Sequence, residues 1–252
     1  MSTTPAIRLE NLSKKFKDFT AVDDLSVDVR AGRVTGLLGR NGAGKTTTLR
    51  MLLGLARPTT GRATLLGHTY GDLPRAAHRV GVAMDALGPV TGATVRGELL
   101  IWVGYLGLSK GRVDEVIGLT GLDGAESKPV AGCSTGMKQR LALATALLAD
   151  PEVLILDEPA NGLDPDGIRW LRDTLRALAA EGRTVLVSSH QLAEVEQTVD
   201  DVVVVQRSLR YAGTLADLTN DGEHRLEERF FGLVDDTMHH SGAAAERTLV
   251  HA

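Results

Sequence analysis

The chain has 252 residues, of which 43% are apolar and 24% are charged, and this composition is that of a globular protein large enough to bury a core. Its net charge of −4 argues against a nucleic-acid-coating surface, and its single cysteine, Cys133, excludes an internal disulfide. Residues 1–8 lack the apolar core of a signal peptide, and no stretch reaches the roughly 20 apolar residues of a membrane span. We therefore expect a protein of a reducing compartment that works at a membrane only through a partner.

The first third of the chain is predicted to contain several short strands and one helix. Residues 7–12 and 25–29 alternate apolar and polar side chains, as half-buried strands do. Residues 14–19 between them are interpreted as a turn region. The remaining elements are strands at 34–38, 62–66 and 80–84 and a helix at 47–55.

The middle of the chain is predicted to be helical. Residues 94–106, 112–120 and 136–149 have helical patterns, and Ser134 or Thr135 is the expected N-cap of the third helix. We interpret residues 86–140 as a helical subdomain inserted into an α/β core.

Strand patterns return after residue 150. Strands are predicted at 153–156, 185–188 and 202–205, and an amphipathic helix at 166–181 has Ile168, Leu171, Leu175 and Leu178 on one face. Strands that alternate with helices indicate a largely parallel, doubly wound sheet. We expect one domain over 1–252, with its core at 6–85 and 141–215, a short helical ending at 216–235 and a disordered tail at 236–252.

A phosphate-binding loop follows the strand at 34–38. Residues 39–46 read Gly-Arg-Asn-Gly-Ala-Gly-Lys-Thr, which is the pattern G-x-x-x-x-G-K-[ST] between a predicted strand and a predicted helix. Glycines let backbone N–H groups close around phosphates, and the helix N-terminus adds unpaired donors. Lys45 would reach the β- and γ-phosphates, and the Thr46 hydroxyl would bind Mg²⁺. The predicted nucleotide contacts are Gly39, Asn41, Gly42, Gly44, Lys45, Thr46 and Thr47.

Two acidic residues end the strand at 153–156. Asp157 would hold Mg²⁺ opposite Thr46. Glu158 is expected to point the other way along the strand pleat, where it could polarise a water for attack on the γ-phosphate. A strand followed by a polar turn is the alternative, and the phosphate loop disfavours it. His190 follows the next strand, so it would emerge at the same carboxyl edge of the sheet and could contact the γ-phosphate.

Residues 133–141 read Cys-Ser-Thr-Gly-Met-Lys-Gln-Arg-Leu, and this segment resembles the signature motif of the nucleotide-binding subunits of ABC transporters. That motif is usually Leu-Ser-Gly-Gly-Gln before a basic helix. The segment keeps Ser134 and Gly136 and departs at Cys133, Thr135 and Met137. The resemblance covers residues 7–234 and implies an α/β fold: a P-loop NTPase core with a mainly parallel central sheet, an antiparallel β subdomain near the N-terminus and an inserted helical subdomain.

The same resemblance implies roles for residues outside the phosphate loop. Ser134 and Gly136 would bind the ATP held by the phosphate loop of a second subunit, with helix N-terminal N–H groups as donors. Phe16 matches the aromatic that stacks on adenine, and a packed loop aromatic is the alternative. Asp164 resembles the key acid of the loop that joins the two sites across the dimer, and His190 resembles the family's switch histidine.

Asp85 departs from the family pattern, which usually has a glutamine at this position. The glutamine oxygen contacts Mg²⁺ and the attacking water, and its loop touches the membrane partner. A carboxylate still offers oxygen to Mg²⁺ but adds charge and shortens the reach. We hypothesise that Asp85 slows hydrolysis, so that Asp85→Gln raises ATPase activity. With an acidic residue at position 85, the chain also resembles the branch of the family that exports peptide antibiotics and related drugs.

We therefore expect an ATP-binding and ATP-hydrolysing subunit, with ATP and Mg²⁺ as cofactors, that powers efflux of a drug, an antibiotic or a peptide by an ABC transporter. Its expected partners are a transmembrane permease and a second copy of the chain or a homologous ATPase subunit, with no nucleic acid. This places it on the cytoplasmic face of the cell membrane, peripheral through the permease.

The alternative is a non-transport ABC ATPase that acts on nucleic acid or ribosomes. Residues 47–132 are too few for the long coiled coil of the DNA-repair relatives and have no sustained heptads. Translation relatives carry two such domains in one chain. A small-molecule kinase with the same loop would not need the segment 133–141.

Overall fold

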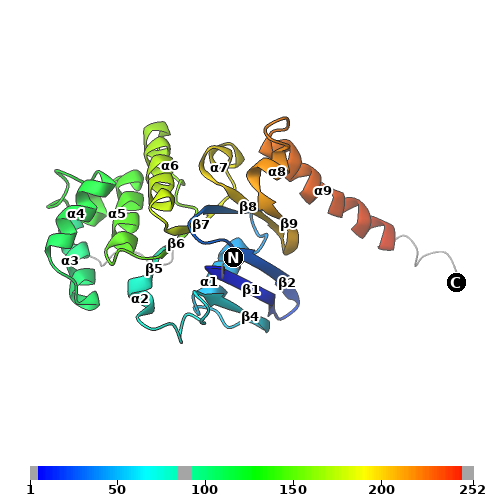
Figure 1. Cartoon of the computed structure of the whole chain (residues 1–252), viewed down its shortest axis with the longest axis horizontal. Coiled ribbons are helices and arrows are strands. Elements are labelled where there is room, and N and C mark those ends of the chain that lie inside the picture. Colours follow the sequence, from blue (N-terminus) through cyan, green and yellow to red (C-terminus); the bar gives the residue numbers. More distant parts are fainter. Residues whose placement is uncertain (1–4, 85–91, 246–252) are drawn as a thin grey trace.

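A computed structural model describes residues 5–84 and 92–245 of the chain. Its central sheet has the strand order β5-β6-β7-β3-β8-β9 (Figure 1). In chain order these strands are β3 (Val34–Leu38), β5 (Val80–Ala83), β6 (Val153–Asp157), β7 (Thr184–Ser189), β8 (Asp201–Gln206) and β9 (Ser208–Thr214). Strands β5, β6, β7, β3 and β8 are parallel, and β9 pairs antiparallel with β8. Because β3 lies between β7 and β8, the loop that follows it leaves the sheet near its middle.

The central sheet is apolar on both faces because successive strand residues point to opposite sides. Leu38 and Leu156 pack into a core with the helices on one face. Leu37 and Ile155 pack into a second core on the other face, together with helix α1 (Lys45–Leu52) and the second sheet. Helix α1 is therefore held between two sheets, which fixes the loop that precedes it.

The second sheet is antiparallel and has the order β2-β1-β4, formed by β1 (Ile7–Phe16), β2 (Phe19–Val29) and β4 (Thr60–Leu65). Most of residues 14–19 belongs to β1 and β2, whereas the sequence interpretation assigned this segment to a turn. Pairing continues to Phe16 and Phe19, so the turn is confined to Lys17 and Asp18. The segment is largely exposed, and an exposed hairpin end has no apolar alternation to reveal it.

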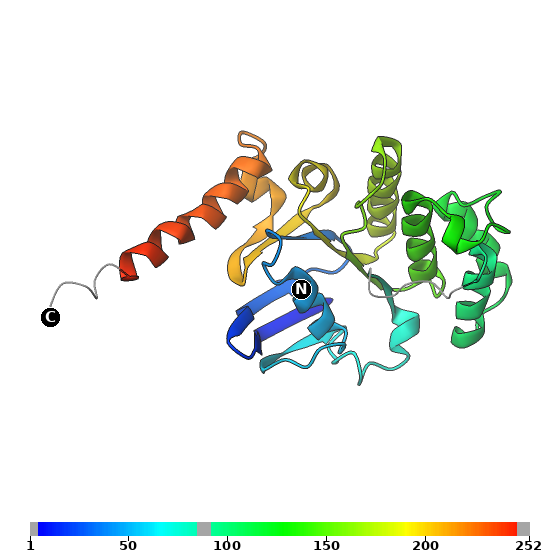
Figure 2. The ribbon, with the colours of Figure 1, turned by 180° about the vertical axis from the view of Figure 1, so that it is seen from behind.

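The remaining helices are α2 (Ala76–Arg79), α3 (Val95–Leu106), α4 (Gly111–Thr120), the 3₁₀ turn η1 (Val130–Gly132), α5 (Thr135–Leu147), α6 (Pro165–Ala180), α7 (Leu192–Thr198), α8 (Leu215–Thr219) and α9 (Leu226–Ala245). Figures 1 and 2 show α3, α4 and α5 together at one end of the molecule and α9 extending from the other. The expected helices at 94–106, 112–120 and 136–149 correspond to α3, α4 and α5. Ser134, rather than Thr135, caps α5, because its Oγ accepts a hydrogen bond from the N–H of Met137 at 3.2 Å.

Several elements differ from the sequence expectations. Three elements, α2, α7 and β9, were not predicted. Helices α2 and α7 have 4 and 7 residues, too few to show a helical period, and β9 is half-buried along most of its length, without the alternation of a strand with one buried face. The expected ending at 216–235 is two helices, with Asn220 in a left-handed conformation closing α8 (φ 52°). Helix α9 continues to Ala245, through residues expected to be disordered, and a run of alanines at 243–245 favours that continuation.

Candidate nucleotide-binding site

The loop 39–46 joins β3 to α1 and has no room for side chains at two of its glycines. A Cβ on Gly39 would lie 2.6 Å from Val205 O, and a Cβ on Gly44 would lie 2.5 Å from Ala21 O. Gly44 also has a φ of 100° at the start of α1, a conformation that glycine alone adopts without strain. The loop backbone therefore packs closely against Val205 and Ala21 on one side, and a ligand would approach from the other side.

The other predicted contacts of the loop lie on its accessible side. Asn41 and Gly42 are exposed, and Gly42 has a φ of 79° with no atom within 4 Å of a Cβ placed on it. Thr46 and Thr47 are half-buried in the first turn of α1. These positions suit backbone and hydroxyl contacts to a phosphate.

Lys45 is the buried cation of this loop. Its Nζ donates a hydrogen bond to Gly39 O at 2.8 Å and lies 3.2 Å from Oε1 of Glu158. Its side chain is 7% exposed, so these oxygens replace water that the ammonium group has lost. Phosphate oxygens could take the same positions around Nζ.

Asp157 and Glu158 diverge at the end of β6. Asp157 is the last strand residue, and its Oδ1 accepts a hydrogen bond from Ser188 Oγ at 2.5 Å. Glu158 has a φ of 53°, a left-handed conformation that costs a non-glycine residue about 1–2 kcal/mol. Its N–H donates to both O and Oγ of Ser188, at 3.2 and 3.0 Å. The strand pleat that was expected to direct Glu158 therefore ends at Asp157, because the backbone turns at Glu158 itself.

Glu158 lies between Lys45 and His190. Its Oε2 is 2.8 Å from Nδ1 of His190, while Oε1 faces Lys45. A carboxylate only accepts hydrogen bonds, so an ionised Glu158 requires the proton on Nδ1 of His190. The side chain of Glu158 is 16% exposed and that of His190 is 42% exposed. The carboxylate thus stands at the boundary between the buried lysine and solvent.

The signature segment is exposed at the first turn of α5. Ser134 is exposed and Gly136 is half-buried, with Cδ2 of Leu163 3.5 Å from the position of a Cβ. Asp164 is also exposed and caps α6 by accepting a hydrogen bond from Gly167 N–H at 2.8 Å. The structure therefore brings the signature next to the loop that contains Asp164. It places both on the helical side of the molecule, whereas α1 lies beneath the central sheet (Figure 1).

Phe16 is an open aromatic platform at the tip of the β1–β2 hairpin. It is 50% exposed, and Nζ of Lys14 lies 4.8 Å from the ring centroid. A half-exposed ring is available for stacking, in contrast to a packed loop aromatic. Asp85, the other predicted residue at the rim of the site, lies outside the described residues.

Sequence reasoning did not identify Ser188 or Gln191. Ser188 is fully buried and bonds to both Asp157 and the backbone of Glu158. Gln191 Nε2 donates to Asn161 Oδ1 at 3.2 Å, so it ties the segment after His190 to the loop before Asp164. Two serines, Ser188 and Ser189, end β7 after the apolar run 185–187, and they were the available signal for Ser188. The contact of Gln191 has no local signal.

A parallel sheet whose central strand leads through a glycine-rich loop into a helix, with carboxylates at the same edge, defines a P-loop nucleotide-binding protein. A family model described as ABC transporter matches residues 22–161. The chain belongs to the ABC transporter family.

Named relatives and a solved structure agree with this assignment. The bacitracin transport ATP-binding protein BcrA of Bacillus licheniformis is 44% identical over 202 residues, which are 79% of this chain and 66% of that protein. The Nod factor export ATP-binding protein I of Ralstonia nicotianae is 40% identical over 219 residues, 84% of this chain and 68% of that protein. The structure of an ATP-binding subunit of an ABC transporter matches with a TM-score of 0.80 at 28% identity, over 90% of this chain and 99% of the other. The expected family and fold class are confirmed.

Among the helices of the described part of the chain, none combines the length and the apolar character needed to cross a bilayer.

Proposed function

We propose that this chain binds and hydrolyses ATP as the energy-coupling subunit of an ABC exporter. The observation that carries the proposal is the 3.2 Å approach of Lys45 Nζ to Glu158 Oε1, because the phosphate-binding cation and the candidate general base meet at one point. Similarity to proteins named for bacitracin transport and Nod factor export supports an exported cargo. A drug, an antibiotic or a peptide is the proposed class.

A triphosphate at the loop would be held by backbone donors and by Lys45. Helix α1 begins at Lys45, so its unpaired N–H groups and partial positive charge face the loop. Phosphate oxygens would replace Gly39 O and the Glu158 carboxylate around Nζ. Displacement of the carboxylate releases Glu158 when ATP binds, so that the base becomes free only in the loaded site.

Glu158 would then accept a proton from the attacking water. The water oxygen bonds to the γ-phosphorus as the bond from that phosphorus to the β–γ bridging oxygen breaks, which yields ADP and inorganic phosphate. Nδ1 of His190, 2.8 Å from Oε2, orients the carboxylate. Ser188 holds the turned backbone of Glu158 in place.

Thr46 in α1 and Asp157 at the end of β6 are the residues that fit Mg²⁺. The donors that Thr46 and Asp157 supply are hard oxygen atoms, and Mg²⁺ at phosphate sites is bound by one or two protein groups together with water and phosphate oxygens. Within the described residues, no three His, Cys, Asp or Glu side chains gather into a protein cage, which agrees with such a site. Thr46 and Asp157 would hold the ion, with Asp85 as a further oxygen donor. The bound ion would neutralise charge on the β- and γ-phosphates.

We propose a dimer in which each ATP lies between two subunits. Ser134, Gly136 and Asp164 are at the surface or partly open to it, so a second copy could reach them. In a head-to-tail dimer the signature segment of one copy would cover the phosphate loop of the other. A homologous ATPase subunit could supply the same surfaces. Phe16 would stack on the adenine ring.

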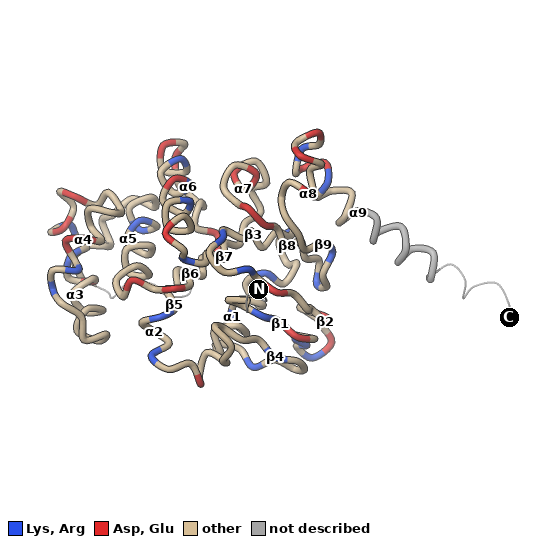
Figure 3. Tube along the Cα trace, in the orientation of Figure 1, with Lys and Arg blue, Asp and Glu red and all other residues tan. Residues whose placement is uncertain are grey.

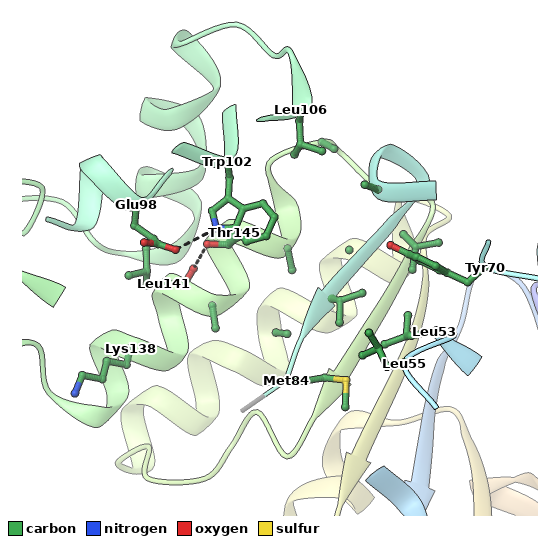
Figure 4. A pocket seen from close by; sticks show the side chains of 18 of the residues that line it. Leu53, Leu55, Tyr70, Met84, Glu98, Trp102, Leu106, Lys138, Leu141 and Thr145 are labelled. Carbon is green, nitrogen blue, oxygen red and sulfur yellow. Dashed lines mark hydrogen bonds between the residues drawn. The ribbon is translucent and has the colours of Figure 1, made fainter. Parts of the chain in front are cut away.

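An apolar groove between β5 and helices α3 and α5 is the proposed docking site of the permease. Figure 4 shows Leu53, Tyr70, Met84, Trp102 and Leu141 around it, and its cavity measures about 270 Å³. Burial raises the pKa of Tyr70, which keeps this phenol neutral.

Exposed apolar side chains continue the groove along α3. Ile101 is 47% exposed and Tyr105 is 78% exposed. Met84 directly precedes Asp85, whose loop is the one that touches the membrane partner in the family. A permease segment in the groove would hold this subunit on the cytoplasmic face of the membrane.

The docking proposal is tested by Ala142→Glu, since Ala142 lines the groove on α5. This substitution should abolish co-purification with a transmembrane permease subunit and leave ATP binding unchanged. Ala180→Glu, at an exposed position on α6, is the matched control. Undiminished co-purification of the Ala142 variant would contradict the docking site.

A role on nucleic acid has no support in the charge distribution. Over the residues that it colours, Figure 3 shows acidic and basic side chains interspersed along the strands and helices, without one basic stripe. The hydrolysis proposal itself is tested by phosphate release from ATP by the purified chain. Turnover that disappears in Lys45→Ala is the expected result, and an equal rate in that variant would contradict it.

A further inference from the structure

The phosphate loop carries two basic side chains, Arg40 and Lys45, and both are paired with carboxylates. Lys45 meets Glu158, as described above. Nη2 of Arg40 donates to Oδ1 of Asp235 at 2.7 Å, a residue 195 positions later on α9. The guanidinium group also lies over the ring of Phe231, with Cζ 5.6 Å from the centroid. The C-terminal helix therefore holds one residue of the phosphate loop.

Helix α9 is well placed to make this contact. Leu226, Phe230 and Val234 recur every fourth residue and are buried to 5% exposure or less, so this stripe anchors the helix to the body. Phe231 and Asp235 form the next stripe, also four residues apart, and both contact Arg40. The anchor fixes the helix, and the second stripe presents a carboxylate and a ring to the loop.

The Arg40–Asp235 pair is accessible to solvent and thus weak. The two side chains are 39% and 53% exposed, and exposed ion pairs contribute only about 0.2–1 kcal/mol. A triphosphate carries several negative charges and would lie beside the same loop. Such a ligand can compete with a single carboxylate for a guanidinium group, which binds phosphate oxygens well.

We propose that Arg40 is a further phosphate-binding residue and that Asp235 is its competitor within the chain. When ATP enters, the guanidinium group leaves Asp235 for a phosphate oxygen, as Lys45 leaves Glu158. The middle of α9, around Asp235, loses a tether at the same moment. ATP affinity and the position of α9 are then thermodynamically coupled, and each affects the other equally. This inference rests on the proposed function, since it requires a triphosphate at the loop.

The test is the dissociation constant for ATP, measured by calorimetry on the full chain in EDTA, which prevents turnover. Asp235→Asn removes the competing charge and leaves Phe231 against Arg40, so it should tighten ATP binding about two- to fivefold. Glu227→Gln makes the same charge change at an exposed position of α9 about 12 Å along the helix and should leave affinity unchanged. The gain should disappear at about 1 M salt, where charges are screened beyond about 3 Å.

Arg40→Gln distinguishes competition from a structural effect of α9. This variant should bind ATP more weakly than wild type, and adding Asp235→Asn to it should give no further gain. In hydrogen exchange, ATP should lower the protection of residues 231–235 in wild type and not in Arg40→Gln. If Asp235→Asn binds ATP no more tightly than wild type, the inference is overturned. The proposed function stands in that case, provided that the wild-type chain binds ATP. A wild-type chain that does not bind ATP overturns both.

Discussion

The two halves of the candidate site differ in how the chain completes them. The phosphate-loop half is closed by internal contacts, since Lys45 is buried and bonded to Gly39 and Glu158. The signature half is open, since Ser134 is exposed and its Oγ accepts a local hydrogen bond from the N–H of Met137. In the proposed dimer, the first half would receive ATP, and the second would be the surface that one copy offers to another.

The largest expected effect lies in the closed half. Glu158→Gln keeps the shape of the side chain and removes the base, so turnover should fall about 10²–10⁴-fold while ATP still binds. The variant should accumulate as an ATP-bound dimer in size-exclusion chromatography. Hydrolysis at the wild-type rate would remove Glu158 from its role.

A smaller effect is expected in the open half. Ser134→Ala removes a hydroxyl that would contact a charged phosphate, worth about 1.5–3 kcal/mol, so turnover should fall about 10- to 100-fold. Thr94→Ala is the matched control, because Thr94 caps α3 through the N–H of Gly97 at 3.1 Å and belongs to no proposed site. Both variants should lose similar helix-cap stability in thermal unfolding. Equal turnover in the two variants would show that Ser134 acts only as a cap.

A smaller effect still is expected for Phe16, the aromatic residue that would stack on adenine. Phe16→Ala should raise the dissociation constant for ATP about fivefold, which corresponds to the lower end of base–aromatic stacking at about 1 kcal/mol. Phe19 sits across the same turn, is 46% exposed and has Arg207 5.1 Å from its centroid. If Phe19→Ala weakens ATP binding instead, the stacking residue has been assigned to the wrong side of the hairpin.

The smallest effect is expected for Ser188, which holds Asp157 and Glu158 in place in the phosphate-loop half of the site. Ser188→Ala removes the hydroxyl between Asp157 and the N–H of Glu158, and should cost about 1 kcal/mol in unfolding free energy and a few-fold in turnover. Urea unfolding and phosphate release measure the two. Full activity with unchanged stability would mean that the left-handed turn at Glu158 does not depend on Ser188.

Sequence patterns were sufficient to place the candidate site residues that follow the ends of strands. The loop 39–46 and the acids at 157 and 158 follow buried strands, and parallel strands bring their carboxyl ends to one edge. That rule also placed His190 beside Glu158, where the structure has it at 2.8 Å.

The rest of the site depends on contacts that leave no local pattern. The turn that directs Glu158 toward Lys45 is a backbone conformation with a φ of 53°, and glutamate gives no sign of it. Arg40 and Asp235 are 195 residues apart, so only the packing of α9 brings them together. Helix α7 is too short for periodicity to identify, and β9 has no alternation of buried and exposed residues.

In the proposed dimer, each ATP is held by the phosphate loop of one copy and the signature of another. The decisive experiment mixes two impaired variants, Lys45→Ala and Ser134→Ala, and measures ATP hydrolysis. A mixed dimer has one site with an intact Lys45 from one copy and an intact Ser134 from the other, so turnover should rise toward roughly a quarter of the wild-type rate. A mixture no faster than the mean of the two variants would contradict the shared site.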